Sequence, residues 1–183
     1  MDGAADAGGA LARYVAEAAG VARIGGDGVR TVYRLPKTLL PEPLGPRLPV
    51  VAMQAVRHPQ DVHLMHDGDS ESGWTDVSAT PGAWVTADLG SAQQVGGVTV
   101  AVGRAFFDFP RRLAVDLSRD GVAWVTVWEG PAYAQTFLGF VRAPRNGELP
   151  FPFPSHVARF VRLRRLDADS PAWHVAEVHV HAP

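Results

Sequence analysis

The chain has 183 residues, of which 46% are hydrophobic and 20% charged, with a formal net charge of -2 and no cysteine. This length allows one domain with a sizeable core and a short appendage, while the charge excludes the basic surface of a nucleic-acid-binding protein and the lack of cysteine excludes disulfides and thiolate metal sites. No apolar run is long enough to cross a bilayer, and the N-terminus lacks the basic start and apolar stretch of a secretory signal.

The first part of the chain differs in pattern from the rest. Residues 9–19 predict a helix, because their apolar residues recur at helical spacing, and Val29–Leu35 predicts a short strand. Residues 36–49 contain five prolines, which indicates an extended linker without regular structure. We expect residues 1–49 to form a helix-strand annex with a proline-rich linker, which could be the tail of a preceding domain. The main domain is then expected to span residues 50–183.

Beyond residue 50, apolar residues recur at every second position. Short segments of this kind, separated by turns and without helices between them, are typical of an antiparallel β-sandwich. The clearest pair flanks Asp120 and Gly121, a dipeptide that suits a tight hairpin turn. The predicted strands cover residues 84–90, 95–103, 113–118, 123–128, 158–166 and 175–181.

Two segments about a hundred residues apart carry oxygen-rich side chains. Residues 67–74 read Asp-Gly-Asp-Ser-Glu-Ser-Gly-Trp and form an acidic loop, whereas residues 173–178 read Trp-His-Val-Ala-Glu-Val. If the fold joins them, Asp67, Ser72 and Glu177 can surround a hard cation with oxygens, helped by backbone carbonyls. The alternative is a plain Asp-Gly turn whose carboxylates are solvated.

The order of these landmarks resembles the discoidin family, also called the coagulation-factor C-type domain, over residues 50–182. The acidic loop is followed by Trp84 with Asp-Leu-Gly, a Ser-Arg-Asp-Gly turn with Trp124, Arg159–Leu163 and Trp173–Val178. The resemblance implies an all-β fold, an antiparallel jelly-roll β-sandwich of the galactose-binding-like type, whose loops at one end bind ligands. Bacterial relatives include carbohydrate-binding modules, and some animal members bind anionic lipid or protein.

The same resemblance implies one structural calcium ion (Ca2+) and no other cofactor. Its ligands would be the side chains of Asp67, Ser72 and Glu177 and the backbone carbonyls of Leu64, Asp69 and Ala176. Members of the family are usually noncatalytic modules of larger exported proteins. We therefore expect an extracytoplasmic location, periplasmic or at the cell surface, within a larger protein.

A nine-residue connection that begins at Arg104 holds three phenylalanines, which are hard to bury together in a loop. Phe106 and Phe107 could stack on a sugar ring while Arg104 and Asp108 hydrogen-bond its hydroxyls. Tyr133, in the next long connection, could form a wall of the same site. This predicts weak glycan binding by a monomeric protein. Two alternatives are an adhesion module that contacts membrane lipid or a protein through this loop, and phenylalanines that plug the end of the sandwich.

No catalytic motif is present. There is no Gly-x-Ser-x-Gly elbow, no phosphate-binding loop and no His-Glu-x-x-His zinc helix. We therefore expect no enzymatic activity. The expected core includes Trp74, Trp84, Trp124 and Trp173. Pro150–Pro154 is expected to be a connection, and Arg162 either to pair with Asp88 or to be exposed.

Overall fold

The computed structural model describes two parts of the chain. It covers residues 22–27, 31–34, 44–78, 80–103, 105, 108–142, 147–168 and 172–183. These residues belong to two compact units, Met1–Pro43 and Leu44–Pro183. Among the described residues, no helix is long and apolar enough to span a bilayer.

The first unit contains a β-hairpin. Its strands β1 (Ala22–Gly26) and β2 (Thr31–Arg34) pair in antiparallel register. β2 lies within the strand predicted at residues 29–35, whereas the sequence pattern does not predict β1. The helix predicted at residues 9–19 lies outside the described residues.

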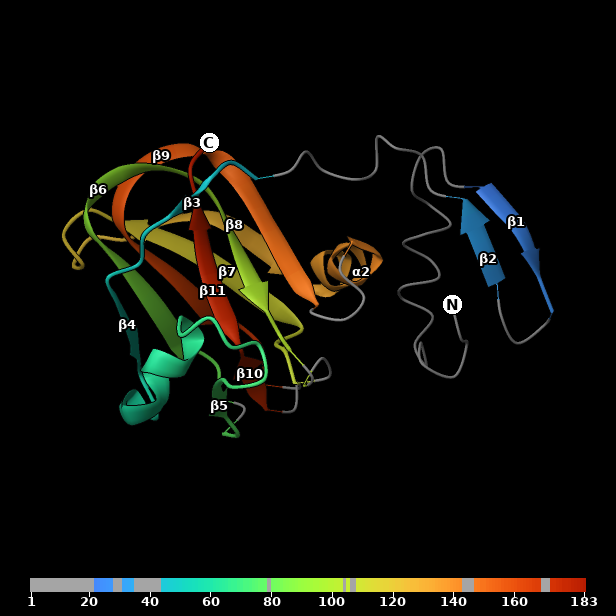
Figure 1. Cartoon of the computed structure of the whole chain (residues 1–183), viewed down its shortest axis with the longest axis horizontal. Helices are drawn as coiled ribbons and strands as arrows, with labels where there is room; N and C mark the ends of the chain where they lie inside the picture. The colour runs from blue at the N-terminus through green and yellow to red at the C-terminus, as the bar shows by residue number, and fades with distance from the viewer. Residues whose placement is uncertain are drawn as a thin grey trace. The chain divides into compact units, whose positions relative to one another are not determined.

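The second unit is a β-sandwich built from one seven-stranded sheet that folds over on itself (Figure 1). The strands follow the order β3-β11-β6-β9-β7-β8, and β4 pairs with β6. The bounds are β3 (Arg47–Leu48), β4 (Ala52–Ala55), β6 (Trp84–Ala101), β7 (Arg112–Ser118), β8 (Val125–Pro131), β9 (Glu148–Arg165) and β11 (Glu177–His181). A separate two-stranded sheet joins β5 (Trp74–Asp76) and β10 (Trp173–Val175), and the helices are the 3-10 helix η2 (Pro59–Met65) and α2 (Tyr133–Arg142).

Two long strands connect the layers, because β6 and β9 have 18 residues each and bend together. Trp84–Asp88 pairs with β4 and with the second half of β9 in one layer, which β7 and β8 complete. Val98–Ala101 pairs with β11 and with the first half of β9 in the other layer. A register shift between Asp88 and Gln93 marks the bend. The predicted all-β antiparallel sandwich is therefore confirmed.

The core lies between these two layers. Val85 and Leu163 point into it from one layer, and Val98 and Phe151 from the other, all at most 1% exposed. Successive strand residues face opposite sides, so that Leu163 is buried whereas its neighbours Arg162 and Arg164 are only partly buried. Burial of each such side chain stabilises the fold by roughly 1.5–3 kcal/mol.

Two expectations about the strands need correction. The segments at 84–90 and 95–103 are parts of one bent strand rather than two strands with a turn between them. Residues 150–154 lie inside β9, with Phe151 and Phe153 buried, and do not form a connection. Prolines are tolerated there because they occupy alternate positions, which leaves the N–H groups of the residues between them free to pair with β6.

Two further segments are more regular than the sequence predicts. Arg47 and Leu48, within the predicted linker, form the strand β3 at the edge of the sheet. The prolines on either side are tolerated because an edge strand pairs on one side only, so the missing N–H groups need not remove a hydrogen bond of the sheet. The connection that begins at Tyr133 contains the helix α2, which packs against β9. Gly139 permits this contact, because a Cβ there would collide with the backbone of Glu148.

Candidate functional site

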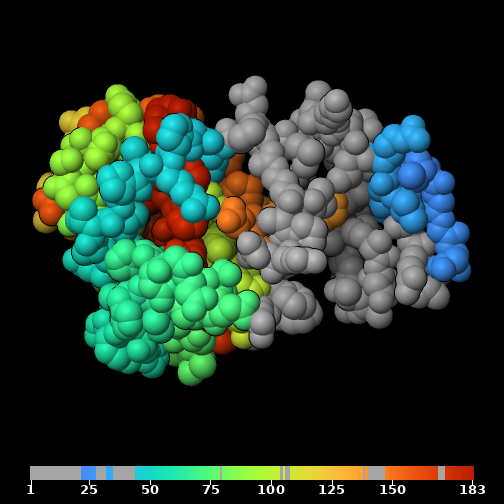
Figure 2. Space-filling model, viewed as in Figure 1, coloured from blue at the N-terminus to red at the C-terminus, as the bar shows by residue number. Residues whose placement is uncertain are grey.

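The structure brings the acidic loop and β11 together. The backbone N–H of Gly68 donates to Glu177 Oε1 at 2.7 Å. Ser72 Oγ lies 2.9 Å from Asp67 Oδ2 and 3.0 Å from the carbonyl oxygen of Asp69. Two carboxylates, one hydroxyl and one carbonyl therefore form a compact oxygen cluster. Figure 2 shows that the chain from η2 through this loop lies at the surface of the second unit.

Two glycines allow the loop to adopt this shape. Gly68 has a φ of 83°, a left-handed conformation that other residues rarely adopt. Gly103, at the end of β6, has a φ of 51°, and a Cβ there would lie 2.5 Å from the carbonyl oxygen of Ser70. The loop can therefore approach the sheet closely, which holds Asp67 beside Glu177.

The two carboxyls of the cluster have opposite pKa shifts. The pKa of Asp67 is lowered, first by the N–H of Asp69 and then by the hydroxyl of Ser72. The pKa of Glu177 is raised, first by burial and then by its proximity to Asp67. An exposed carboxylate beside a buried one, with further oxygens around them, supplies the donor atoms that a hard divalent cation prefers.

The remaining predicted metal ligands lie next to this cluster in the chain. Leu64 is in η2, and Ala176 directly precedes Glu177. Within the described ranges, no group of three or more His, Cys, Asp or Glu side chains is placed to hold a metal ion. A cation at this position would therefore depend on two carboxylates, the Ser72 hydroxyl and backbone oxygens.

The predicted glycan residues are only partly described. Arg104, Phe106 and Phe107 lie outside the described residues. Asp108 is half-buried, and its carbonyl oxygen accepts a hydrogen bond of 2.6 Å from the N–H of His174. Tyr133 is 44% exposed and begins α2.

The loop end, defined here as the end of the sandwich where the segment at Asp108 meets β5 and β10, holds a further polar residue, His174. The sequence alone does not indicate His174 as a site residue. Its Nδ1 lies 2.8 Å from Thr75 Oγ1 across the pair of β10 and β5. Its ring packs on Gly73, where a Cβ would lie 2.6 Å from its Cε1. The available signal is its place between Trp173 and Val175, which are both buried, so that an outward-facing histidine is expected.

Burial and the nearby carboxylate have opposite effects on the pKa of His174. Burial lowers the pKa of His174, and the negative charge of Asp108 acts in the opposite direction. Among the described residues, the carboxylate of Asp108 has no hydrogen-bond partner. The loop end thus presents a neutral imidazole beside an acceptor carboxylate, on backbone that is held by hydrogen bonds.

The tryptophans separate into two groups. Trp74 and Trp173 are fully buried and meet edge to face at 5.5 Å, as predicted. The core prediction is wrong for Trp84 and Trp124, which are only partly buried on the outer face of the sheet. The guanidinium of Arg162 lies 4.5 Å from the ring centre of Trp84 and 3.6 Å from that of Trp124.

Arg162 therefore does not pair with Asp88. Its Nε donates to Thr86 Oγ1 at 3.1 Å instead. Asp88 is held by Arg159, which donates two hydrogen bonds of 2.8 Å to its carboxylate. The sequence alone does not show which arginine binds Asp88. Arg159 and Arg162 both lie in β9, and only the register of β9 against β6 decides which of them is close to Asp88.

Comparison with known proteins places this geometry in context. The family model described as the F5/8 type C domain matches residues 54–178. A search of curated proteins finds no match. Solved structures provide matches to the fold across about three quarters of the chain.

Three of these structures are carbohydrate-binding modules. The CBM32 of AlyQ, in complex with 4,5-unsaturated mannuronic acid, is 21% identical with a TM-score of 0.61, and the match covers 75% of this chain and 99% of that one. CpGH89CBM32-5 from Clostridium perfringens, in complex with GalNAc-β-1,3-galactose, is 20% identical with a TM-score of 0.57 and coverages of 75% and 100%. A pectin-binding module is 17% identical with a TM-score of 0.54 and coverages of 73% and 91%. At these identities the likeness is one of fold.

Proposed function

The chain belongs to the F5/8 type C domain family, and we propose that it is a noncatalytic carbohydrate-binding module. The pair of Asp108 and His174 at the loop end carries this proposal. Hydrogen bonds hold the pair in place. The carboxylate of Asp108 would accept from sugar hydroxyls, and the imidazole nitrogen of His174 that does not face Thr75 would offer a second polar group. In the sequence Phe106 and Phe107 directly precede Asp108, and phenylalanine rings beside this pair would suit the C–H face of a pyranose.

Binding to a single sugar should be weak. A few hydrogen bonds and one stacked ring bury little area, so we expect a Kd on the order of millimolar or somewhat tighter. The solved relatives of this fold support the ligand class, since their complexes contain a uronic acid derivative and an amino-sugar disaccharide.

A glycan array followed by calorimetry tests the proposal. Asp108→Asn and His174→Gln should each weaken binding at least tenfold while keeping the melting temperature, because both substitutions preserve size and the backbone contacts. Glu129→Gln, on the exposed face of β8, is a matched control and should bind as the wild type does. Binding to anionic vesicles but to no glycan would replace this function with the adhesion function.

We also propose that the acidic loop holds a structural calcium ion. Asp67, Ser72 and Glu177 would bind it through their side chains, with backbone oxygens of Leu64, Asp69 and Ala176 completing the shell. The charge of the ion would favour the charged form of Glu177, whose pKa is raised first by burial and then by its proximity to Asp67. Its role would be to fix the acidic loop against β11.

Thermal melts with calcium and with a chelator test this second proposal. Calcium should raise the melting temperature of the wild type, because a ligand of the native state stabilises it by mass action. Asp67→Asn should abolish the response. Asp120→Asn is the matched control, because Asp120 is also a loop aspartate with a lowered pKa, and it should keep the response. Equal melting temperatures of the wild type in calcium and chelator would refute the proposal.

We further propose that the protein is a monomeric, extracytoplasmic part of a larger protein. The support is the sugar-binding function itself, since polymeric glycans are found mainly outside the cytoplasm. Light scattering on purified protein should give the mass of one chain. Detection of the parent protein only in cytoplasmic fractions would contradict the location.

A further inference from the structure

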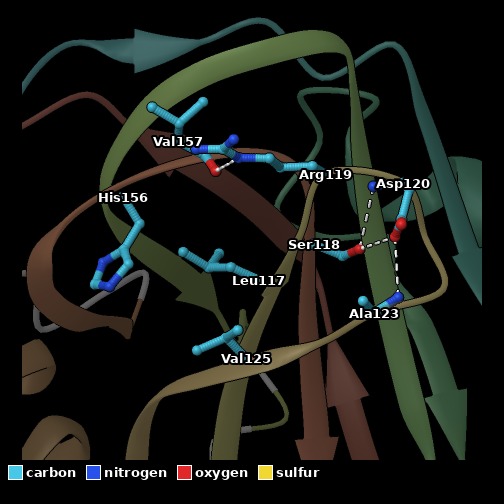
Figure 3. A pocket seen from close by; sticks show the side chains of 8 residues that line it. All are labelled: Leu117, Ser118, Arg119, Asp120, Ala123, Val125, His156 and Val157. Carbon is cyan, nitrogen blue, oxygen red and sulfur yellow. Dashed lines mark hydrogen bonds between the residues drawn. The ribbon is translucent and has the colours of Figure 1, made fainter.

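A groove unrelated to the loop end lies beside the turn of the β7–β8 hairpin (Figure 3). It has a volume of about 370 Å³ and is bordered by the hairpin on one side and by the bend of β9 on the other. Leu117, Val125 and Val157 form its apolar lining, and Arg119, Asp120 and His156 are its main polar residues. It shares no residue with the acidic loop or with the pair of Asp108 and His174.

The hairpin turn is a rigid wall of this groove. The carboxylate of Asp120 accepts hydrogen bonds from the N–H groups of Val122 at 2.8 Å and Ala123 at 2.9 Å. The hydroxyl of Ser118 lies 3.0 Å from the same carboxylate. Gly121 supplies the left-handed residue of the turn, with a φ of 78°. A wall formed in advance lowers the entropy cost of binding.

One cation faces the groove without a carboxylate partner. Arg119 Nε donates to the carbonyl oxygen of Val157 at 3.2 Å, which ties the turn to β9. The terminal amino groups of Arg119 have no partner in the described part of the chain. Among the described residues no ion pair joins Arg119 to Asp120, whose carboxylate accepts its hydrogen bonds within the turn through Oδ1. His156 is exposed, and its Nδ1 contacts the carbonyl oxygen of Pro154, to which it can only donate.

The lining of the groove is aliphatic and exposed. Val125 is 60% exposed and Val157 is 37% exposed, while Leu117 lies beneath them at 4%. Among the described residues, no Phe, Tyr or Trp ring lines the groove, so it lacks the large flat face on which a sugar ring stacks. An exposed aliphatic hollow of this size instead suits a branched aliphatic side chain.

An open strand edge adjoins the groove. Val125 is the first residue of β8, and within the described sheet β8 pairs only with β7. Its outer N–H and carbonyl groups can therefore pair with an added extended segment. The edge supplies backbone hydrogen bonds, the hollow an apolar contact and Arg119 a charge.

We propose that this groove docks an extended acidic peptide segment. An aliphatic side chain of the peptide fills the hollow over Val125 and Val157, and its neighbouring carboxylate binds the amino groups of Arg119. The peptide backbone adds to the edge of β8. The positive charge of Arg119 selects an acidic rather than a basic peptide.

Selection from a displayed library of linear peptides on the whole protein tests the proposal. Enriched peptides should combine aliphatic and acidic residues, and a synthetic copy of the most enriched peptide is then measured by fluorescence anisotropy. Arg119→Gln and Val125→Thr should each weaken its binding at least tenfold. Val77→Thr is the matched control, because Val77 is also an exposed valine, at 75%, outside the groove, and it should leave binding unchanged.

Other results overturn the proposal. These are a failure to enrich any peptide, enrichment of basic or purely aromatic peptides, and equal binding by wild type, Arg119→Gln and Val125→Thr at matched melting temperatures. Asp108→Asn should leave peptide binding intact, so the outcome is independent of glycan binding at the loop end.

Discussion

Protonation of His179 should destabilise the protein in mildly acidic solution. His179 lies on β11 opposite Thr99 and is partly buried. Its pKa is lowered from 6.5 to about 4, first by burial and then by the nearby charges of Arg47 and His181. The pKa of His181 is also lowered, first by burial. Its two ring nitrogens lie 2.8 Å from Thr99 Oγ1 and 2.8 Å from the carbonyl oxygen of Gly45.

The sign follows from comparing the folded and unfolded states. Above pH 6.5 the imidazole of His179 is neutral in both states, and its titration has no effect on stability. Between pH 6.5 and about 4 the unfolded state binds a proton that the folded state excludes, so the free energy of unfolding falls as the pH falls. When the pH falls from 7.5 to 5, about 1.5 pH units lie below the pKa of the unfolded state. At about 1.4 kcal/mol per unit, the free energy of unfolding falls by about 2 kcal/mol.

Urea unfolding of wild type and His179→Gln at pH 7.5 and pH 5 measures this contribution. The loss of stability between the two pH values should be smaller in the variant by about 2 kcal/mol. Carboxyl groups and His181 titrate in both proteins, so their effects cancel in the difference. An equal loss in both proteins would refute the assignment of a low pKa to His179.

Three substitutions test the packing and the hairpin by urea unfolding. Phe151→Ala should cost about 3–5 kcal/mol, because the ring is fully buried and lies 4.9 Å from that of Trp128; a smaller loss would show that the core collapses around the gap. Gly121→Ala should cost about 1–2 kcal/mol, since its φ is 78° although the nearest atom would be 3.5 Å away; wild-type stability would show that the turn rearranges. Asp116→Asn should lower the free energy of unfolding by about 1–3 kcal/mol, because it weakens the 2.8 Å hydrogen bond that Arg164 donates to the buried carboxylate of Asp116. Asp116→Ala, which removes the acceptor, should lower it further.

Local patterns predict the strands, the hairpin and the family. Period-two alternation at residues 113–118 and the Asp120-Gly121 turn depend on neighbours in the chain, and the structure has β7, β8 and that turn as expected. The order of the motifs is likewise a property of the chain alone, and it leads to the same family as the matched domain model over residues 54–178.

Contacts between distant strands decide what the sequence leaves open. The register of β6 against β9 pairs Asp88 with Arg159 and places Arg162 against two tryptophans. A shift of one residue would turn Arg162 to the other face of the sheet. The bend of β6 and β9 converts predicted turns into continuous strands, and it brings the β9 bend beside the hairpin turn to form the groove. His174 is selected as a site residue only because β10 pairs with β5 and the loop at Asp108 reaches its backbone. Such placements arise from packing across a hundred residues of sequence, which local propensity does not encode.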